Sequence, residues 1–228
     1  MNLNEQLLIN LVKTYYPEKR IQQIPFPRIS YKEAMEKYGN DRPDIREDKN
    51  DENLLAFCWV IDFPFFERTD ASDNPDTFGE WTFTHNPFSR PIPEHMENLM
   101  QKKNIGDIIT SQYDITLNGY EIGGGSIRNH EVQALMTVFE ILGYKEQEIK
   151  SNFGHMLTAF SLGTPPHGGI AWGFDRLMML LHNEPNIREV MAFPKTGEGK
   201  DLMMQSPSTI SDKQLKELSL ELKLKKHA

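Results

Sequence analysis

The sequence of 228 residues has a single cysteine, Cys58, so it cannot form an internal disulfide. Cys58 lies in the apolar run of residues 54–61, which predicts a buried thiol without a catalytic role. Apolar runs of the roughly 18 residues that a membrane-spanning helix needs are also missing, and the first residues lack the basic start and apolar stretch of a secretion signal. We therefore expect a cytoplasmic protein that does not contact a membrane.

Positive charge is scarce as well. The chain has 25 basic and 33 acidic residues and a formal net charge of -8, whereas a general electrostatic grip on nucleic acid needs a basic face. Any contact with RNA is therefore expected to be local. The sequence also lacks the phosphate-binding loop G-x-x-x-x-G-K-S/T and the dinucleotide fingerprint G-x-G-x-x-G, which excludes two common nucleotide-binding architectures.

The apolar content is sufficient for a real core. Hydrophobic residues make up 38% of the chain and charged residues 25%, which is typical of a globular protein rather than a disordered one. A chain of this length is expected to bury roughly 70% of its unfolded surface on folding. We expect one domain, or one domain with a small appendage.

The first 53 residues read as two helices and a linker. Apolar residues repeat at helical spacing until Pro17 ends the first helix. Ser30, with Glu33 three residues later, resembles a capping box for a short helix that ends at Gly39. Residues 40–53 are nearly all polar or charged, which predicts a surface linker.

The next segment contains the predicted strands. Residues 54–61 form a continuous apolar run rich in β-branched and aromatic side chains, which predicts a strand buried on both faces at the centre of a sheet. Residues 81–84 alternate aromatic and hydroxyl side chains and predict a second strand. The clearest hairpin covers residues 113–122, where Asn118 and Gly119 form the strongest two-residue turn signal.

This turn predicts the register of the hairpin. Leu117 pairs with Tyr120 across a two-residue turn. The next pair joins Thr116 to Glu121. Asp114 lies two residues before Thr116 and shares its face, so two carboxylates project from one side. A solvated polar face has the same pattern, so the pair by itself does not define a site.

Further helices and a glycine-rich strand follow the hairpin. Ser126 is expected to cap a helix whose apolar stripe ends at Gly143. A second helix runs to Gly163. The glycine-rich strand then leads into a helix at residues 175–182, and a polar helix near residues 213–220 precedes a basic end.

The segment GIAWGFDR at residues 169–176 is a glycine-bearing strand with an acidic residue and an arginine at the start of a helix. Glycines let a flat ligand lie against the backbone, and Arg176 can place a planar cation over a purine or against phosphate. A tightly packed strand followed by a surface arginine has the same sequence pattern. Both interpretations are open at this level.

The same segment resembles motif 3 of class II aminoacyl-tRNA synthetases. Other motifs follow the order of the bacterial aspartyl enzymes: PFPR at 25–28, EAM at 33–35, FPFFE at 63–67, HNPF at 85–88, LNGYEIGGGSIR at 117–128 and AFPKT at 192–196. Together they span almost the whole chain. The sequence is therefore similar to the C-terminal part of such a catalytic domain, which implies a partial α+β fold with an antiparallel sheet flanked by helices.

The resemblance implies roles for particular residues. Asp114 and Glu121 correspond to carboxylates that hold Mg²⁺, and Glu121 also to a contact with ATP. His85 and Arg128 correspond to residues that bind the substrate aspartate, with Arg128 on its side-chain carboxylate. The other implied ATP contacts are Gly173, Phe174, Asp175 and Arg176.

Four details accompany this assignment. Strand parity turns Arg128 away from Glu121, so the triple glycine between them must bend the chain. The family often has a second histidine where Asn86 stands, and an amide there can still form hydrogen bonds. We expect Phe174 to lie in the core, and we expect Asp175 to orient the next residue or to cap the helix.

The implied activity is the ATP- and Mg²⁺-dependent conversion of L-aspartate to aspartyl-adenylate, followed by transfer of aspartate to tRNA(Asp) in protein biosynthesis. The implied parts are a helical lead-in at 1–39, a linker at 40–53 where bacterial relatives have an inserted domain, the site-bearing sheet and helices at 54–205, and a C-terminal helix with a basic tail at 206–228. Motifs 1 and 2 and the anticodon-binding domain have no counterpart. A homodimer is expected for the full-length family, and this chain alone is expected not to form the adenylate.

Two other interpretations stay open. One is a different class II enzyme, such as an asparaginyl-tRNA synthetase or an asparagine synthetase, although Arg128 and the segment FPKT at residues 193–196 favour the aspartyl enzyme. The other is a non-catalytic relative that binds nucleotide or a partner protein. Whether the parent enzyme charges one tRNA or two depends on the anticodon-binding domain.

Overall fold

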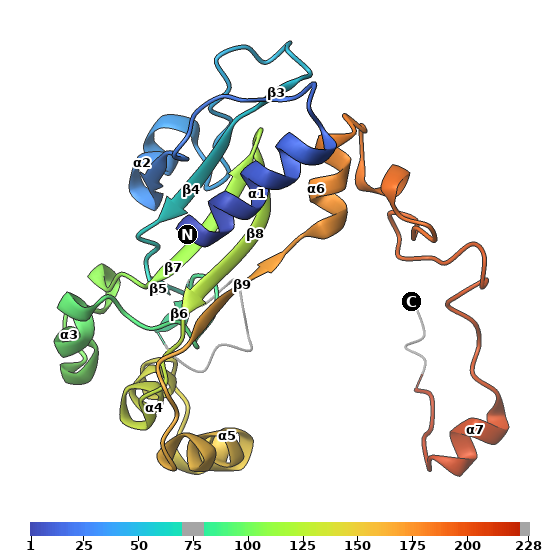
Figure 1. Ribbon diagram of the computed structural model, residues 1–228. Coiled ribbons are helices and arrows are strands. Elements are labelled where there is room, and N and C mark those ends of the chain that lie inside the picture. The colour runs from blue at the N-terminus through green and yellow to red at the C-terminus, as the bar shows by residue number, and fades with distance from the viewer. Residues whose placement is uncertain (70–79, 224–228) are drawn as a thin grey trace. The chain divides into compact units, whose positions relative to one another are not determined.

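The computed structural model describes residues 1–69 and 80–223, and the chain divides into two compact units, Met1–Asn183 and Glu184–Ala228 (Figure 1). The polar loop expected at 70–79 and the last residues of the basic tail lie outside the described residues. No helix in the described ranges is long and apolar enough to cross a membrane. The finer division of the chain at residues 39, 53 and 205 stays a prediction.

A five-stranded sheet forms the frame of the first unit. Its order is β2 (Arg28–Ser30), β4 (Phe57–Ile61), β7 (Gln112–Leu117), β8 (Tyr120–Ile127) and β9 (Gly168–Trp172). The β2–β4 pair is parallel, and the other three pairs are antiparallel. The sheet and its helices confirm the α+β fold class.

The apolar run of residues 54–61 is strand, but its predicted place was wrong. The central strand is β7, and the run divides at Ala56 into β3 (Leu54–Leu55) and β4. β3 leaves the main sheet and pairs in parallel with β1 (Arg20–Ile21). Burial on both faces is confirmed, since all residues from Leu54 to Val60 are buried.

Two helices cover one face of the sheet, α1 (Asn2–Tyr15) and α6 (Phe174–Leu181) (Figure 1). Their apolar sides pack on strand residues that share this face. Glu5 of α1 is buried, but its carboxylate accepts hydrogen bonds from Trp59 Nε1 at 3.0 Å and from the Phe26 amide at 3.2 Å. These bonds compensate the burial of the carboxylate and hold α1 in one position. The buried cluster consists of Leu8, Ile9, Val12, Phe26, Leu55, Phe57, Trp59, Ile115, Leu117, Ile122, Leu177 and Leu181.

The opposite face is only partly covered. Helix α2 (Tyr31–Tyr38) packs through Ala34 over the β4 side, with Cys58, Val60 and Phe63 beneath it. Ser30 Oγ accepts the Glu33 amide at 3.2 Å, and Gly39 ends α2 in a left-handed conformation, which confirms the predicted cap and stop. Burial raises the pKa of the Cys58 thiol to about 12, which agrees with an unreactive cysteine.

A second apolar cluster lies beyond the ends of these strands. It joins α3 (Met96–Gln101), α4 (Val132–Ile141) and α5 (Glu146–Ser161) to the small sheet of β5 (Phe66–Arg68) and β6 (Trp81–Phe83). Short 3₁₀ turns precede α3 and β7, at Pro93–His95 and Ile105–Asp107. Strand β6 confirms the strand predicted at residues 81–84. The two long helices are also confirmed, and they end before the positive-φ glycines Gly143 and Gly163.

The predicted helix cap at Ser126 was wrong. Ser126 is the seventh residue of β8, and α4 begins only at Val132, with Glu131 as its N-cap and no side-chain cap. The triple glycine does not end the strand, because Gly123, Gly124 and Gly125 continue the pairing with both neighbours.

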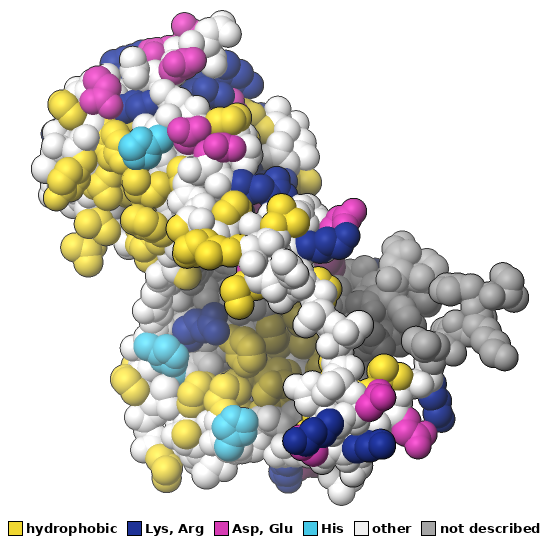
Figure 2. All heavy atoms as spheres, turned by 90° about the vertical axis from the view of Figure 1, so that its right-hand side faces the viewer, with side chains coloured by type: hydrophobic (Ala, Val, Ile, Leu, Met, Phe, Trp, Pro, Cys, Tyr) yellow, Lys and Arg dark blue, Asp and Glu magenta, His cyan; other side chains and the backbone are white. Residues whose placement is uncertain are grey.

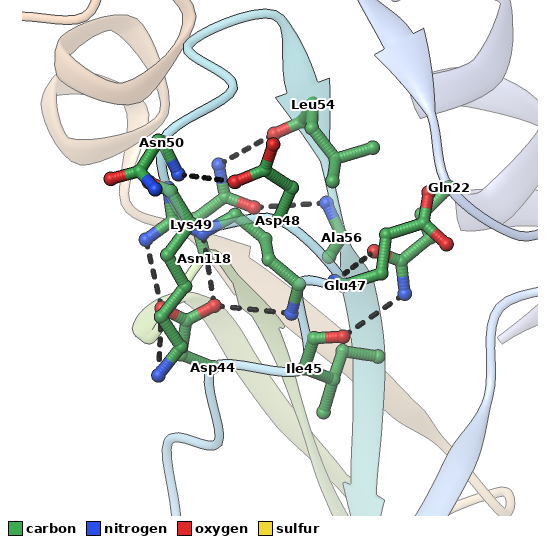
Figure 3. A network of polar contacts seen from close by, with 11 residues as sticks. Gln22, Asp44, Ile45, Glu47, Asp48, Lys49, Asn50, Leu54, Ala56 and Asn118 are labelled. Atoms are coloured by element: carbon green, nitrogen blue, oxygen red, sulfur yellow. Dashed lines mark hydrogen bonds and ion pairs between the residues drawn. The ribbon is translucent and has the colours of Figure 1, made fainter.

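The segment 40–53 contains no helix or strand, as predicted, but polar contacts hold it in place (Figure 3). Arg46 Nη2 and Asp44 Oδ2 lie 2.8 Å apart, with both side chains one-fifth exposed. Gln22 Nε2 donates to the carbonyl of Ile45 at 3.0 Å. The segment is therefore a folded surface loop.

The second unit has little regular structure in its described part. It contains a 3₁₀ turn at Ile187–Val190 and helix α7 (Asp212–Glu217), which confirms the predicted polar helix. Lys195 forms an ion pair with Asp201. No residue of 184–223 is buried.

Candidate functional site

The site is built on the β7–β8 hairpin. Leu117 pairs with Tyr120 and Thr116 with Glu121, as predicted from the turn. Both turn residues, Asn118 and Gly119, have positive φ angles of 51° and 86°. This is the geometry that makes an Asn-Gly pair favourable in a two-residue hairpin.

A β-bulge changes the parity of β8 directly after Glu121. Asp114 pairs with Gly124, so Ile122 is an extra residue between two regular stretches of the ladder. Beyond a bulge, residues of the opposite parity reach the same face. Ser126 and Arg128 therefore share a face with Glu121. The change of parity that the assignment of Arg128 required is present, but it occurs at Ile122 and not, as predicted, in the triple glycine.

Two glycines bring the strands and the carboxylates close together. A Cβ at Gly124 would lie 2.6 Å from Asp114 Oδ1 and 3.3 Å from Glu121 Oε1. A Cβ at Gly125 would lie 1.9 Å from the carbonyl oxygen of Gly169 on β9. Any side chain at either position would displace a carboxylate or separate two strands.

On this uncovered face, the side chains enclose a cavity of about 340 Å³. Its lining comes from the β7–β8 hairpin, from β9 and from the loop after β6. All four residues predicted to bind metal or aspartate are among the lining residues: Asp114, Glu121, Arg128 and His85. The lining residues are His85, Asn86, Gln112, Asp114, Glu121, Gly124, Gly125, Ser126, Arg128 and Ala171.

The acidic side of the cavity is formed by Asp114 and Glu121. Asp114 is 6% exposed, and burial, with the nearby charge of Glu121, raises its pKa to about 7. Gln112 Nε2 lies 3.5 Å from Asp114 Oδ1 and opposes this rise by donating a hydrogen bond. Near neutral pH the Asp114 carboxyl is therefore poised between its two protonation states.

The basic side is formed by Arg128. Its Nη1 lies 3.4 Å from Asn86 Oδ1 and 3.5 Å from Ser126 Oγ, and its Cζ lies 5.5 Å from the centre of the Phe88 ring. Among the described residues, no carboxylate lies within 4 Å of this guanidinium. Arg128 is thus held by neutral groups, and its positive charge is available to pair with an anionic ligand.

His85 lines the cavity from the loop that follows β6. Its ring meets the ring of Phe63 edge to face, with centroids 4.7 Å apart. Although part of the residue stays exposed, burial lowers the pKa of His85 below its ordinary value. A neutral imidazole, able to donate from one nitrogen and accept at the other, therefore prevails at pH 7.

Ala171 of the segment 169–176 lines this cavity, whereas the predicted ATP contacts at residues 173–176 adjoin it without lining it. Arg176 Nη1 donates to the backbone carbonyl of Glu121, which ties the start of α6 to the bulge. The prediction that Phe174 lies in the core was wrong, because its side chain is 65% exposed. Asp175 does not cap α6, since Gly173 is the N-cap and no side chain makes the capping bond.

Sequence reasoning missed Gln112 as a member of the site. Its signal was available, because Gln112 precedes Asp114 by two residues and must share its face. Ser126 was assigned to a helix cap, and only the bulge shows that it lines the cavity.

The fold is that of a class II aminoacyl-tRNA synthetase catalytic domain. Among solved structures, an aspartyl-tRNA synthetase from Entamoeba histolytica resembles the chain with a TM-score of 0.57 and 21% identity, covering 88% of this chain and 40% of that one. An asparaginyl-tRNA synthetase from the same organism has a TM-score of 0.58 and 20% identity, with coverages of 88% and 43%. At this identity, both comparisons concern the fold alone.

The chain belongs to the family of tRNA synthetases class II (D, K and N), whose model matches residues 1–197. A curated relative from Chlorobium chlorochromatii (strain CaD3), named Aspartate–tRNA(Asp/Asn) ligase, is 48% identical over 176 residues, which is 77% of this chain and 28% of that protein. Another of the same name, from Phenylobacterium zucineum (strain HLK1), is 45% identical over 199 residues, which is 86% and 31%. The chain thus spans about three-tenths of the length of these relatives.

Proposed function

We propose that this chain is a segment of an aspartate–tRNA ligase and supplies the aspartate- and metal-binding part of its active site. The observation that carries the proposal is the bulge at Ile122, which brings Arg128 onto the same face as Asp114 and Glu121. One wall of the cavity is therefore cationic and the other is acidic. Such a site suits an amino acid with a side-chain carboxylate on one side and a metal-bound phosphate on the other.

The acidic pair fits Mg²⁺ in composition. The cavity offers two adjacent carboxylates, and the described residues contain no group of three or more metal-binding side chains. Mg²⁺ is commonly held by one or two carboxylates together with substrate phosphates, so Asp114 and Glu121 suffice as protein ligands. Bound there, Mg²⁺ would neutralise charge on the phosphates of ATP.

The proposed preference for aspartate follows from Arg128. A guanidinium binds a carboxylate through two charge-assisted hydrogen bonds, whereas an asparagine amide presents one oxygen and two N–H donors. Both N–H donors would face the Arg128 guanidinium, which has no hydrogen-bond acceptor. Discrimination by an unpaired buried polar group reaches several orders of magnitude in suitable sites.

In the proposed reaction, the α-carboxylate of aspartate attacks the α-phosphorus of ATP, and pyrophosphate leaves. A hydroxyl of the terminal ribose of tRNA then attacks the carbonyl carbon of the adenylate, so that the aspartyl ester forms and AMP leaves. The chain's own residues orient and bind: Arg128 holds the side-chain carboxylate, His85 offers a neutral ring, and Arg176 lies beside the bulge for the nucleotide. Positioning and charge stabilisation of this kind need no side-chain nucleophile.

Calorimetric titration tests the proposal directly. We expect L-aspartate to bind the chain more tightly than L-asparagine, and Arg128→Ala to weaken aspartate binding roughly a hundredfold, because a bidentate charge-assisted contact is lost. Arg42→Ala, on the exposed loop, is the matched control and should bind as the wild type does. Equal affinity for the two amino acids would contradict the proposal.

The nucleotide side is tested in the same way. Magnesium-ATP should bind the wild-type chain, and Arg176→Ala should weaken that binding. Loss of ATP binding in Arg176→Ala, with aspartate binding unchanged, would separate the two halves of the site. If neither ligand binds the wild-type chain, a non-catalytic interaction module becomes the better interpretation.

A further inference from the structure

Asn86 belongs to the loop that follows β6 and lines the cavity beside Arg128, at the end of β8. Its Oδ1 accepts three hydrogen bonds, from the Phe88 amide at 3.0 Å, from Ser89 Oγ at 3.3 Å and from Arg128 Nη1 at 3.4 Å. The first closes an Asx turn, and the second ties the Ser89 side chain to the same oxygen. The third links that turn to the guanidinium that faces the substrate cavity.

The backbone fixes the spacing between these two residues. The Asn129 amide donates to the Phe88 carbonyl at 2.8 Å, and the Arg90 amide donates to the Ile127 carbonyl at 2.8 Å. Ser89 is fully buried and forms a β-bridge with Arg128. The loop and the end of β8 therefore form one rigid ladder, and Oδ1 of Asn86 is held at a set position relative to Arg128.

Asn86 orients the guanidinium without neutralising it. Both hydrogen bonds of Arg128 to side chains use Nη1, and the Phe88 ring lies beside Cζ. A side-on pair with a carboxylate would use Nε and Nη2, which make neither of these bonds. A carboxylate at position 86 would occupy the same geometry but would compensate the charge.

We propose that Asn86 is a positioning residue that selects for the anionic side chain of aspartate by holding Arg128 through a neutral oxygen. This role rests on the proposed function of Arg128. The selectivity comes from the pair. Arg128 supplies the positive charge, and Asn86 supplies a hydrogen-bond acceptor that does not neutralise this charge. An amide keeps this property at every pH, because it does not titrate.

The test compares Asn86→Asp and Asn86→Ala with the wild-type chain. Asn86→Asp keeps the shape and the Asx acceptor but places a negative charge against Arg128, whereas Asn86→Ala removes the acceptor. Asn40→Asp is the matched control, because Asn40 Oδ1 also closes an Asx turn, by accepting the Arg42 amide at 2.8 Å, far from Arg128 in sequence. Each protein is titrated with L-aspartate and L-asparagine, and its unfolding midpoint is measured.

We expect Asn86→Asp to bind L-aspartate roughly tenfold to a hundredfold more weakly, and to lose its preference over L-asparagine, while its unfolding midpoint stays near that of the wild type. Asn40→Asp should change neither affinity nor preference. An unchanged preference in a folded Asn86→Asp chain would overturn the proposal. A merely structural role would move the midpoint and leave the preference intact.

A second measurement separates the role of Asn86 from that of Arg128. The Nε–H resonance of Arg128, assigned by its disappearance in Arg128→Lys, reports the orientation of the guanidinium by ¹⁵N NMR without any ligand. It should be visible in the wild type and shifted in Asn86→Asp and Asn86→Ala. If it is unshifted, or exchanges too fast to be seen in the wild type, Asn86 does not hold Arg128. If the shift occurs but L-aspartate does not bind, only the proposed function of Arg128 fails.

Discussion

At the scale of single residues, the site brings together charged side chains that form no ion pair with each other among the described residues. Asp114 is buried beside the like-charged Glu121, and Arg128 contacts neutral oxygens and the Phe88 ring. Each arrangement costs stability in the free protein and favours a charged ligand. The close approach of β8 to β9 at Gly125 is the steric counterpart, because a Cβ at Gly125 would lie 1.9 Å from the carbonyl oxygen of Gly169.

The raised pKa of Asp114 predicts a pH-dependent stability. The folded-state pKa is about 7 against an ordinary value of 3.8, so the penalty is absent below pH 4 and grows as the pH rises through 7. Asp114→Asn should therefore stabilise the chain at pH 8, by roughly 2–4 kcal/mol, and have little effect at pH 4. Urea unfolding at both pH values measures this.

Added Mg²⁺ provides the control for that prediction. If Asp114 holds the metal, Mg²⁺ should raise the unfolding midpoint of the wild type at pH 8 and should not raise that of Asp114→Asn. An equal effect of the substitution at pH 4 and pH 8 would show that packing, and not ionisation, sets the stability.

The contact between β8 and β9 predicts that alanine is tolerated very differently at Gly125 of β8 and at Gly169 of β9. Gly125→Ala would place its Cβ 1.9 Å from a backbone oxygen, so we expect a loss of more than roughly 3 kcal/mol or failure to fold. Gly169→Ala meets nothing within 4 Å and should change the free energy of unfolding by less than about 0.5 kcal/mol. Similar values for the two variants, measured by urea unfolding, would contradict the close approach.

At the scale of elements, the hairpin tip also organises the strands beside it. Asn118 Nδ2 donates to the Leu54 carbonyl at 2.9 Å, and its Oδ1 accepts the Ala56 amide at 2.9 Å (Figure 3). These are the backbone groups at the break between β3 and β4. The turn residue thus satisfies the polar groups that the break would leave unpaired.

The two hydrogen bonds of the Asn118 side chain, here called the latch, predict a loss of stability when they are removed. Asn118→Ala removes both bonds and places alanine at a φ of 51°, so it should destabilise the chain by roughly 2–4 kcal/mol. Asn50→Ala is the control, because Asn50, in the segment 40–53, donates to Asp48 Oδ1 through its backbone amide, which the substitution keeps. Thermal unfolding compares the two, and an Asn118→Ala chain as stable as Asn50→Ala would contradict the role of the latch.

At the scale of the whole molecule, we expect the proposed site to supply only part of what adenylate formation requires. Arg128 is the one arginine among the described residues that line the cavity, and Arg176 lies beside it. On the side of the molecule drawn in Figure 2, acidic and basic side chains form small mixed groups together with exposed hydrophobic side chains. This distribution agrees with the formal net charge of -8.

We therefore expect the purified 228-residue chain not to catalyse aspartate-dependent exchange of pyrophosphate into ATP above background. The measurement needs a full-length aspartate–tRNA ligase as positive control and the chain without aspartate as blank. Aspartate binding without exchange would agree with a partial site. Exchange at a rate near that of the positive control would show that the described residues suffice.

The sequence alone was enough for the local structure and the family. Helical spacing predicted the main helices, Ser30 and Glu33 predicted a cap, and the Asn118–Gly119 turn predicted a register that the structure confirms. These features depend on residues within a few positions of one another, so a local pattern contains the information.

Only the tertiary structure decided which distant residues share the cavity. The extra residue at Ile122 reverses the parity of β8, and whether a strand bulges there depends on its pairing with both β7 and β9. The same pairing makes Ser126 a strand residue, and the ladder between the loop and β8 brings Asn86 to Arg128. The β8–β9 pairing and the contact between Asn86 and Arg128 join residues about 40 or more positions apart, and no local pattern of the chain specifies them.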